Sequence, residues 1–169
     1  DRFVVPGFID IHTYSDFTLP LQPAAEAKLR QGVTTDVTGN CGFSPFPLGD
    51  DQVGRHHGAF FEPALNERWD SLGDYATALE AAGLGINVAP LIGLGAVRTT
   101  TMGMDKRPPT ERELDAMCSL LATAMQSGAF GASSGLVYTP GSFADTAELA
   151  ALAGVVARHG GIYATHIRN

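Results

Sequence analysis

The stretch Val5-Pro6-Gly7-Phe8-Ile9-Asp10-Ile11-His12 is a short apolar run that leads to a histidine. The pattern returns twice: one run leads to Cys41 in Val37-Thr38-Gly39-Asn40-Cys41-Gly42, and another to His166 in Tyr163-Ala164-Thr165-His166. Runs that are apolar on both faces are typical of parallel strands covered by helices. The sequence therefore predicts three buried strands, each followed by a side chain that can bind a metal.

These three side chains are expected to meet. The carboxyl ends of parallel strands lie at one rim when a sheet curls into a barrel, so His12, Cys41 and His166 would converge there. Imidazole nitrogen and thiolate sulfur are ligands that zinc accepts. The residues thus predict a zinc site at the carboxyl end of the sheet.

Strand and helix signals alternate along the chain. Gly32, Gly83, Gly128 and Gly160 follow the predicted helices, and Thr110 opens a capping box. Alternating strands and helices predict an α/β fold with a right-handed parallel sheet. The five strands are expected at Phe8–His12, Thr34–Thr38, Ile86–Ile92, Ala129–Ser133 and Gly161–His166, with helices at 23–31, 71–83, 110–128 and 145–160.

The length indicates part of a barrel. A closed (β/α)8 TIM barrel takes about 250 residues, whereas this chain has 169. We expect a partial barrel of about the first five βα units, cut directly after the fifth strand. Residues 43–70, rich in proline, charge and aromatics, form an irregular loop insertion over the barrel mouth. This insertion is either a lid or substrate wall, or a surface excursion that covers apolar rim.

The composition narrows the class of protein. A hydrophobic content of 44% with 17% charged residues is typical of a folded globular chain, and a net charge of −7 argues against nucleic acid as a partner. No apolar run approaches the ~18 residues of a membrane span, and no signal peptide is visible. Cys41 and Cys118 do not suggest a disulfide framework, so the expected location is the cytoplasm.

Four segments resemble one family when taken together: PGFIDIH at 6–12, GVTTDVTGNCG at 32–42, GAFGASSGLVYTPG at 128–141 and YATHIR at 163–168. They are similar to the N-acyl-D-amino-acid deacylases, or D-aminoacylases, of the metal-dependent amidohydrolase superfamily. The resemblance implies that residues 1–169 are the N-terminal part of the catalytic barrel. It also implies that the remaining barrel strands and a flanking β-sandwich lie outside these residues.

The resemblance further implies an activity: zinc-dependent hydrolysis of the amide bond of a small-molecule N-acyl-D-amino acid, releasing a D-amino acid and a carboxylate. Cys41 and His166 would bind the zinc, with His12 assisting, and Tyr138 would bind substrate. The family strand ends in His-x-His, but Tyr14 stands at the second position here. Because phenol, with a pKa of about 10, is a poor zinc ligand, the metal position of that pair is expected to be weakened or lost.

No catalytic residue can be assigned, because the resemblance places the general-base aspartate beyond Asn169. This piece alone is therefore expected to be inactive. Two alternatives remain. The chain is a non-catalytic or incomplete barrel fragment that assembles with a partner or self-associates through its open sheet, or the protein is a cyclic amidase of the same superfamily. Cys41 argues against the cyclic amidase.

Overall fold

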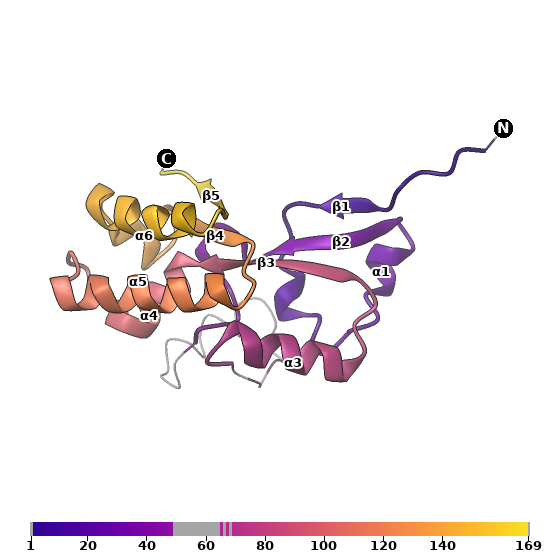
Figure 1. Cartoon of the computed structure of the whole chain (residues 1–169), viewed down its shortest axis with the longest axis horizontal. Helices are drawn as coiled ribbons and strands as arrows, with labels where there is room; N and C mark the ends of the chain where they lie inside the picture. Colours follow the sequence, from indigo (N-terminus) through magenta and orange to yellow (C-terminus); the bar gives the residue numbers. More distant parts are fainter. Residues whose placement is uncertain (1, 49–64, 66, 68, 169) are drawn as a thin grey trace.

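The computed structural model describes residues 2–48, 65, 67 and 69–168. Its centre is one sheet of five parallel strands that lie in sequence order (Figure 1). The sheet curls into half of a barrel, so the predicted partial TIM barrel with five strands is confirmed. The strands are β1 (Phe8–Asp10), β2 (Val33–Thr38), β3 (Asn87–Gly93), β4 (Gly131–Gly135) and β5 (Ile162–His166).

Helices connect the strands, and α3, α4 and α5 lie on one side of the sheet (Figure 1). Their apolar sides pack on the sheet in a core that includes Ile92, Met117, Leu121 and Leu152. The helices are α1 (Glu26–Leu29), α3 (Leu72–Ala82), α4 (Leu94–Met102), α5 (Glu111–Gln126) and α6 (Thr146–Arg158), with short 3-10 turns η1 (Ser15–Phe17), η2 (Asn40–Gly42) and η3 (Gly141–Phe143).

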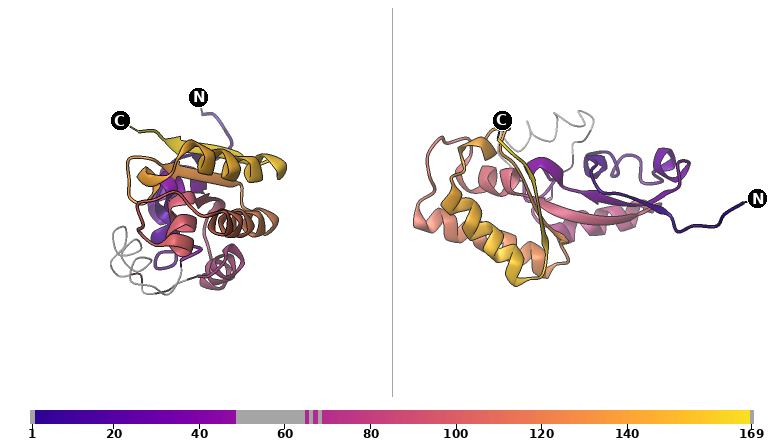
Figure 2. Two further views of the ribbon diagram at one scale, coloured as in Figure 1. Left: turned by 90° about the vertical axis from the view of Figure 1, so that its left-hand side faces the viewer. Right: turned by 90° about the horizontal axis from the view of Figure 1, so that it is seen from above.

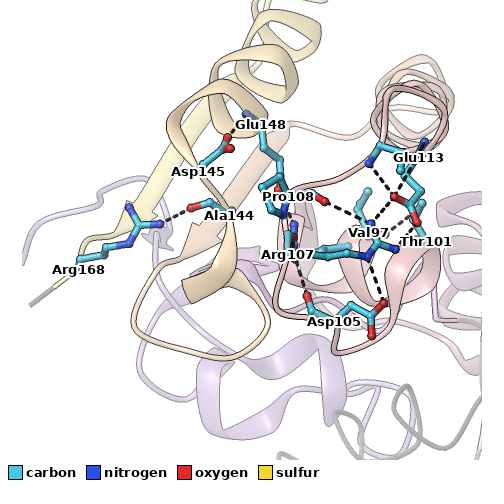
Figure 3. Close-up of polar contacts among 12 residues, drawn as sticks. Val97, Thr101, Asp105, Arg107, Pro108, Glu113, Ala144, Asp145, Glu148 and Arg168 are labelled. Atoms are coloured by element: carbon cyan, nitrogen blue, oxygen red, sulfur yellow. Dashed lines mark hydrogen bonds and ion pairs between the residues drawn. The ribbon is translucent and has the colours of Figure 1, made fainter.

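The helix starts that the sequence signals are present. Thr110 Oγ1 accepts a hydrogen bond from the Glu113 backbone N–H at 3.3 Å, and Glu113 Oε2 accepts one from Thr110 N–H at 2.7 Å. Arg107 donates to both oxygens of Glu113, at 2.8 and 2.7 Å, and Asp145 caps α6 through the N–H of Glu148 (Figure 3). These contacts satisfy N–H groups that have no partner within the helix.

Some boundaries differ from the prediction. Helix α4 was not predicted, because it begins at Leu94 directly after β3 and has no side-chain cap. Leu94, the first residue of this helix, is buried in the core. Helix α1 is shorter than residues 23–31, since Ala25 has a left-handed backbone with φ of 48° and α1 starts after it. Strand β1 ends at Asp10, two residues before His12.

The predicted insertion at 43–70 is described only in part. Residues 43–48 contain neither helix nor strand. Residues 49–64, which include His56 and His57, lie outside the described residues. The prediction of a lid or substrate wall therefore stays a prediction.

The inner face of the curled sheet is open. A hollow of about 520 Å³ is lined by apolar side chains such as Ile11, Val37 and Leu91. Ile9 is 61% exposed, Ile11 74% and Phe130 53%. Residues 2–7 extend away from the sheet (Figure 2) and do not cover this face. In the described parts of the chain, no helix has the length and apolar character needed to cross a membrane.

An ion pair lies inside the helical layer. Arg98 of α4 is completely buried and donates to Glu148 of α6, which is 3% exposed. Arg98 also donates to the carbonyl oxygens of Asp105, at 3.3 Å, and Arg107, at 2.6 Å. Burial raises the pKa of Glu148, and the hydrogen bond from Arg98 opposes that rise. The pair therefore joins α4, α6 and the loop between α4 and α5.

A second buried acid links η1 to the end of β2. Asp16 is 1% exposed, and its Oδ2 accepts the backbone N–H of Gly39 at 3.0 Å. Its Oδ1 is among the buried side-chain atoms without a hydrogen-bond partner. Burial raises the pKa of Asp16 from 3.8 to about 8, although the Gly39 hydrogen bond acts in the opposite direction. The folded protein therefore favours the protonated carboxyl.

We predict that Arg98→Met lowers the free energy of unfolding by about 3–5 kcal/mol, because it leaves the Glu148 carboxylate buried without its partner. Urea denaturation of the complete protein measures this loss. Arg30→Met is the matched control, since the Arg30–Glu26 ion pair on α1 is 79% and 70% exposed, and its removal should change stability little. An equal loss in the free energy of unfolding for the two variants would contradict a stabilising role of the buried Arg98–Glu148 ion pair.

We also predict a pH dependence from Asp16. Its folded-state pKa of about 8 lies above its ordinary value of 3.8, so its proton adds stability that is full below about pH 4 and is lost as the pH rises towards 8. Asp16→Asn should remove this slope from the free energy of unfolding. The exposed Asp115→Asn change should leave the slope intact. A wild-type slope retained in Asp16→Asn would show that another group causes it.

Candidate metal centre

Three predicted ligands meet at the carboxyl ends of their strands. Cys41 Sγ lies 3.5 Å from His12 Nε2 and 3.7 Å from His166 Nδ1. With metal bonds of about 2.3 Å to sulfur and 2.0–2.1 Å to nitrogen, a tetrahedral zinc separates two such ligands by about 3.6 Å. The structure thus brings Cys41 close to each of the two histidines, and each of the two separations fits a pair of zinc ligands.

The centre is not complete in the described residues. Among them, no group of three or more His, Cys, Asp or Glu side chains has the arrangement needed to hold a metal ion by itself. The measured distances instead give two ligand pairs that share the Cys41 sulfur. The role of each residue as a ligand remains a proposal.

The position of Cys41 depends on an unusual turn. Cys41 has φ of 53°, and the flanking Gly39 and Gly42 have φ of 74° and 80°. A left-handed backbone costs a residue other than glycine about 1–3 kcal/mol. A side chain at Gly39 would also place its Cβ 1.9 Å from the carbonyl oxygen of Leu91. Glycine at 39 therefore permits both the turn and its close approach to β3.

One hydroxyl holds this turn against β4. Ser133 is completely buried, and its Oγ donates to the carbonyl oxygen of Gly39 and accepts the N–H of Gly42 at 2.9 Å. The two bonds bracket Cys41 on both sides. Asn40 ties the turn to the other side of the site, because its Nδ2 donates to the carbonyl oxygens of Val37, at 2.9 Å, and Thr13, at 3.3 Å.

Aromatic side chains border the cluster. The Tyr14 ring lies 5.8 Å from the His12 ring, and the Tyr14 hydroxyl hydrogen-bonds with Cys41. Burial raises the pKa of Tyr14, and the bond with Cys41 adds to this rise, so the phenol stays neutral. A neutral phenol is a hydrogen-bonding group and a poor metal ligand.

Tyr138 lies beside the cluster as well. Its ring is 5.3 Å from the His166 ring and 5.3 Å from Phe43, and the residue is 38% exposed. Tyr138 thus presents part of its surface next to the candidate centre. Arg168 points elsewhere, since it donates to the carbonyl oxygen of Ala144 (Figure 3).

Sequence reasoning did not find the contacts through which Asp16, Asn40 and Ser133 shape the centre. Ser133 was read only as part of a strand, since a serine in a small-residue run carries no signal for its contacts. Asn40 and Asp16 were near recognised motifs, but their partners come from other elements. The donor pattern at the strand ends did identify His12, Cys41 and His166.

Comparison with known proteins gives consistent results, although no family model matches the chain. An N-acyl-D-aspartate deacylase from Alcaligenes xylosoxydans xylosoxydans is 40% identical over 98% of this chain and 33% of its own length. A D-aminoacylase from the same organism is 39% identical over 98% of this chain and 34% of its own length.

Solved structures show the same relationship. An N-acyl-D-glutamate deacylase from Bordetella bronchiseptica, complexed with zinc and a phosphonate inhibitor, superposes with a TM-score of 0.86 at 38% identity, covering 97% of this chain and 34% of that one. A D-aminoacylase described as defining a novel subset of amidohydrolases gives 0.84 at 38% identity, with the same coverage. A further D-aminoacylase structure, at 0.84 and 37% identity, concerns a binuclear metal centre with one-metal activation and second-metal attenuation; it too covers 97% of this chain and 34% of that one.

The identity extends over nearly the whole chain and accompanies the same curled arrangement of strands. The chain spans about one third of the length of the relatives that it matches. On this evidence, the chain belongs to the N-acyl-D-amino-acid deacylase, or D-aminoacylase, family of the amidohydrolase superfamily.

Proposed function

We propose that the complete protein is a zinc-dependent hydrolase that cleaves the amide bond of linear N-acyl-D-amino acids. The observation that carries this proposal is the position of the Cys41 sulfur between two imidazoles, at 3.5 and 3.7 Å. The names of the relatives support the substrate class, since they describe deacylases of N-acyl-D-aspartate and N-acyl-D-glutamate. The products are a carboxylate and a free D-amino acid.

Cys41, His166 and His12 would hold the zinc. When bound, zinc polarises a substrate carbonyl and lowers the pKa of a bound water towards about 7. The protein contributes the placement of the ligands: Ser133 and the flanking glycines fix the turn of Cys41, and β5 presents His166. Tyr138 would contact the substrate, because its partly exposed ring stands beside His166.

We propose that a residue outside residues 1–169 transfers the proton. We place the general base on an aspartate outside residues 1–169, as the family resemblance implies. A general base within hydrogen-bond reach of the attacking water contributes about 10²- to 10⁴-fold to the rate. This chain alone is therefore expected to lack the deacylase activity of the complete protein.

The open inner face supports a larger domain. Ile9, Ile11 and Phe130 leave apolar surface in contact with water, and each Å² of such surface that becomes buried contributes about 25 cal/mol to stability. We infer that residues 1–169 are the N-terminal part of a closed barrel and that further strands cover this face. Self-association of the isolated chain through the same face follows from the same exposure.

We predict that zinc retention depends on Cys41 more than on His12. Cys41 contacts both imidazoles, whereas His12 is joined to the cluster through one contact with the shared sulfur and stands beside the neutral phenol of Tyr14. Metal analysis of the complete protein should give about one zinc per chain, most of it lost in Cys41→Ala and less in His12→Ala. Cys118→Ala, at the other free cysteine, is the matched control. Zinc retained by Cys41→Ala at the wild-type level would refute this ligand set.

We predict that the complete protein releases D-amino acids from N-acetyl-D-aspartate, N-acetyl-D-glutamate or an apolar N-acetyl-D-amino acid. The L-enantiomers are the stereochemical control, and a cyclic amide such as a hydantoin tests the alternative reaction. Product analysis with and without a chelator gives the zinc dependence. Turnover of the cyclic amide alone, or deacylation unaffected by complete metal removal, would overturn the proposed function.

A further inference from the structure

A lysine of α1 contacts both of the first two strand regions. Lys28 Nζ lies 2.5 Å from Asp10 Oδ2, 3.0 Å from Thr13 Oγ1 and 3.4 Å from Asp36 Oδ1. The Lys28 side chain is 23% exposed and that of Asp36 is fully buried. The ammonium therefore lies mostly inside the protein, between the end of β1 and the middle of β2.

The contacts on Lys28 are electrostatic as well as directional. Asp36 Oδ2 accepts the Ser15 hydroxyl at 2.6 Å, while its Oδ1 makes no well-aligned hydrogen bond. Asp36 Oδ1 forms an ion pair with Lys28 Nζ at 3.4 Å. Opposite charges attract each other without the linear geometry that a hydrogen bond requires. Removing the lysine would leave a buried carboxylate without a counter-charge.

Asp10 transmits this anchoring to His12. Its Oδ1 accepts the backbone N–H of His12 at 3.1 Å, while its Oδ2 is bound to Lys28. The carboxylate cannot rotate without losing one of the two partners. The neighbouring Thr13 is also fixed, since its Oγ1 accepts both from Lys28 and from the N–H of Ser15, the latter at 3.3 Å.

The hydrogen bonds between β1 and β2 do not hold the backbone of His12 in place. Strand β1 ends at Asp10, and its pairing with β2 is irregular between Phe8 and Ile9. His12 therefore leaves the sheet before it reaches Cys41. Its backbone is held by Asp10, and Asp10 is held by Lys28.

We propose that Lys28 is a positioning residue for the candidate metal centre. Through Asp10 and Thr13 it holds His12 at 3.5 Å from the Cys41 sulfur. The inference rests on the proposed function, because it requires a metal at this pair of side chains. It adds that the charge of Lys28 on α1, which is not itself a metal ligand, determines how well His12 binds the metal.

The test uses cobalt(II) in place of zinc in the complete protein. Cobalt affinity and the visible absorption bands of the bound ion report the ligand geometry independently of turnover. Lys28→Met should weaken cobalt binding about 10-fold, the lower end of the usual effect of outer residues that orient metal ligands, and should shift the absorption bands. Lys28→Arg keeps the charge and should restore most of the affinity. Arg30→Met, at the C-cap of the same helix, should match the wild type.

A double variant separates positioning from general stability. If Lys28 acts through His12, adding Lys28→Met to His12→Ala should cause little further loss of cobalt affinity, because coupled residues give non-additive effects. Should Lys28→Met fail to fold, Asp10→Asn provides the same comparison, since it weakens the contact with Lys28 and leaves the Lys28–Asp36 pair in place.

The outcomes are distinct. A wild-type protein that binds no cobalt would overturn the proposed function, and the inference with it. A wild type that binds cobalt, together with a folded Lys28→Met variant of unchanged affinity and spectrum, would overturn only the role of Lys28. Fully additive losses in the double variant would also overturn it, since they would indicate a role in stability alone.

Discussion

The left-handed turn at Gly39-Asn40-Cys41-Gly42 is the constraint on which the candidate centre depends. Cys41 reaches both histidines only because its backbone leaves β2 with φ of 53°. The cost of that conformation is offset by the two hydrogen bonds of Ser133 to the residues on either side of the Cys41–Asn40 pair. The backbone oxygen of Cys41 then lies so close to Gly135 that a Cβ there would be 2.0 Å from it. A turn held in this way fixes the position of the Cys41 sulfur before a metal binds.

The neighbouring polar groups serve the same purpose at the other strand end. Asp16 accepts the N–H of Gly39, Asn40 donates to Thr13, and Lys28 joins Asp10 to Asp36. Buried polar groups cost free energy unless they are paired, and several of these are only partly paired. Their directional contacts join the segment after β1 to the turn after β2. Apolar packing alone would leave the relative position of the two segments much less defined.

The sequence was sufficient for the sheet and for the ligand candidates. Apolar, β-branched runs marked the strands, and His12, Cys41 and His166 stood out because reactive side chains follow strand ends at the rim of a barrel. Helix α4 was not predictable in the same way, because Leu94 follows β3 with neither a capping side chain nor a loop signal. Ser133 and Lys28 were missed for a related reason. Their partners lie 91 to 94 and 8 to 18 residues away in the chain, and local patterns carry no information about such contacts.

The contact between Cys41 and His166 has a consequence for the curvature of the sheet. Cys41 follows β2, and His166 is the last residue of β5. The two strands are separated in the sheet by β3 and β4, and the two residues are 125 positions apart in the chain. The contact therefore joins two strands that are not neighbours, which is possible because the sheet is curled. A metal shared by the two side chains would bind only where the curled sheet brings them together, so its binding free energy would stabilise the curled sheet. Metal binding and the curvature of the sheet would then be coupled, so that each favours the other.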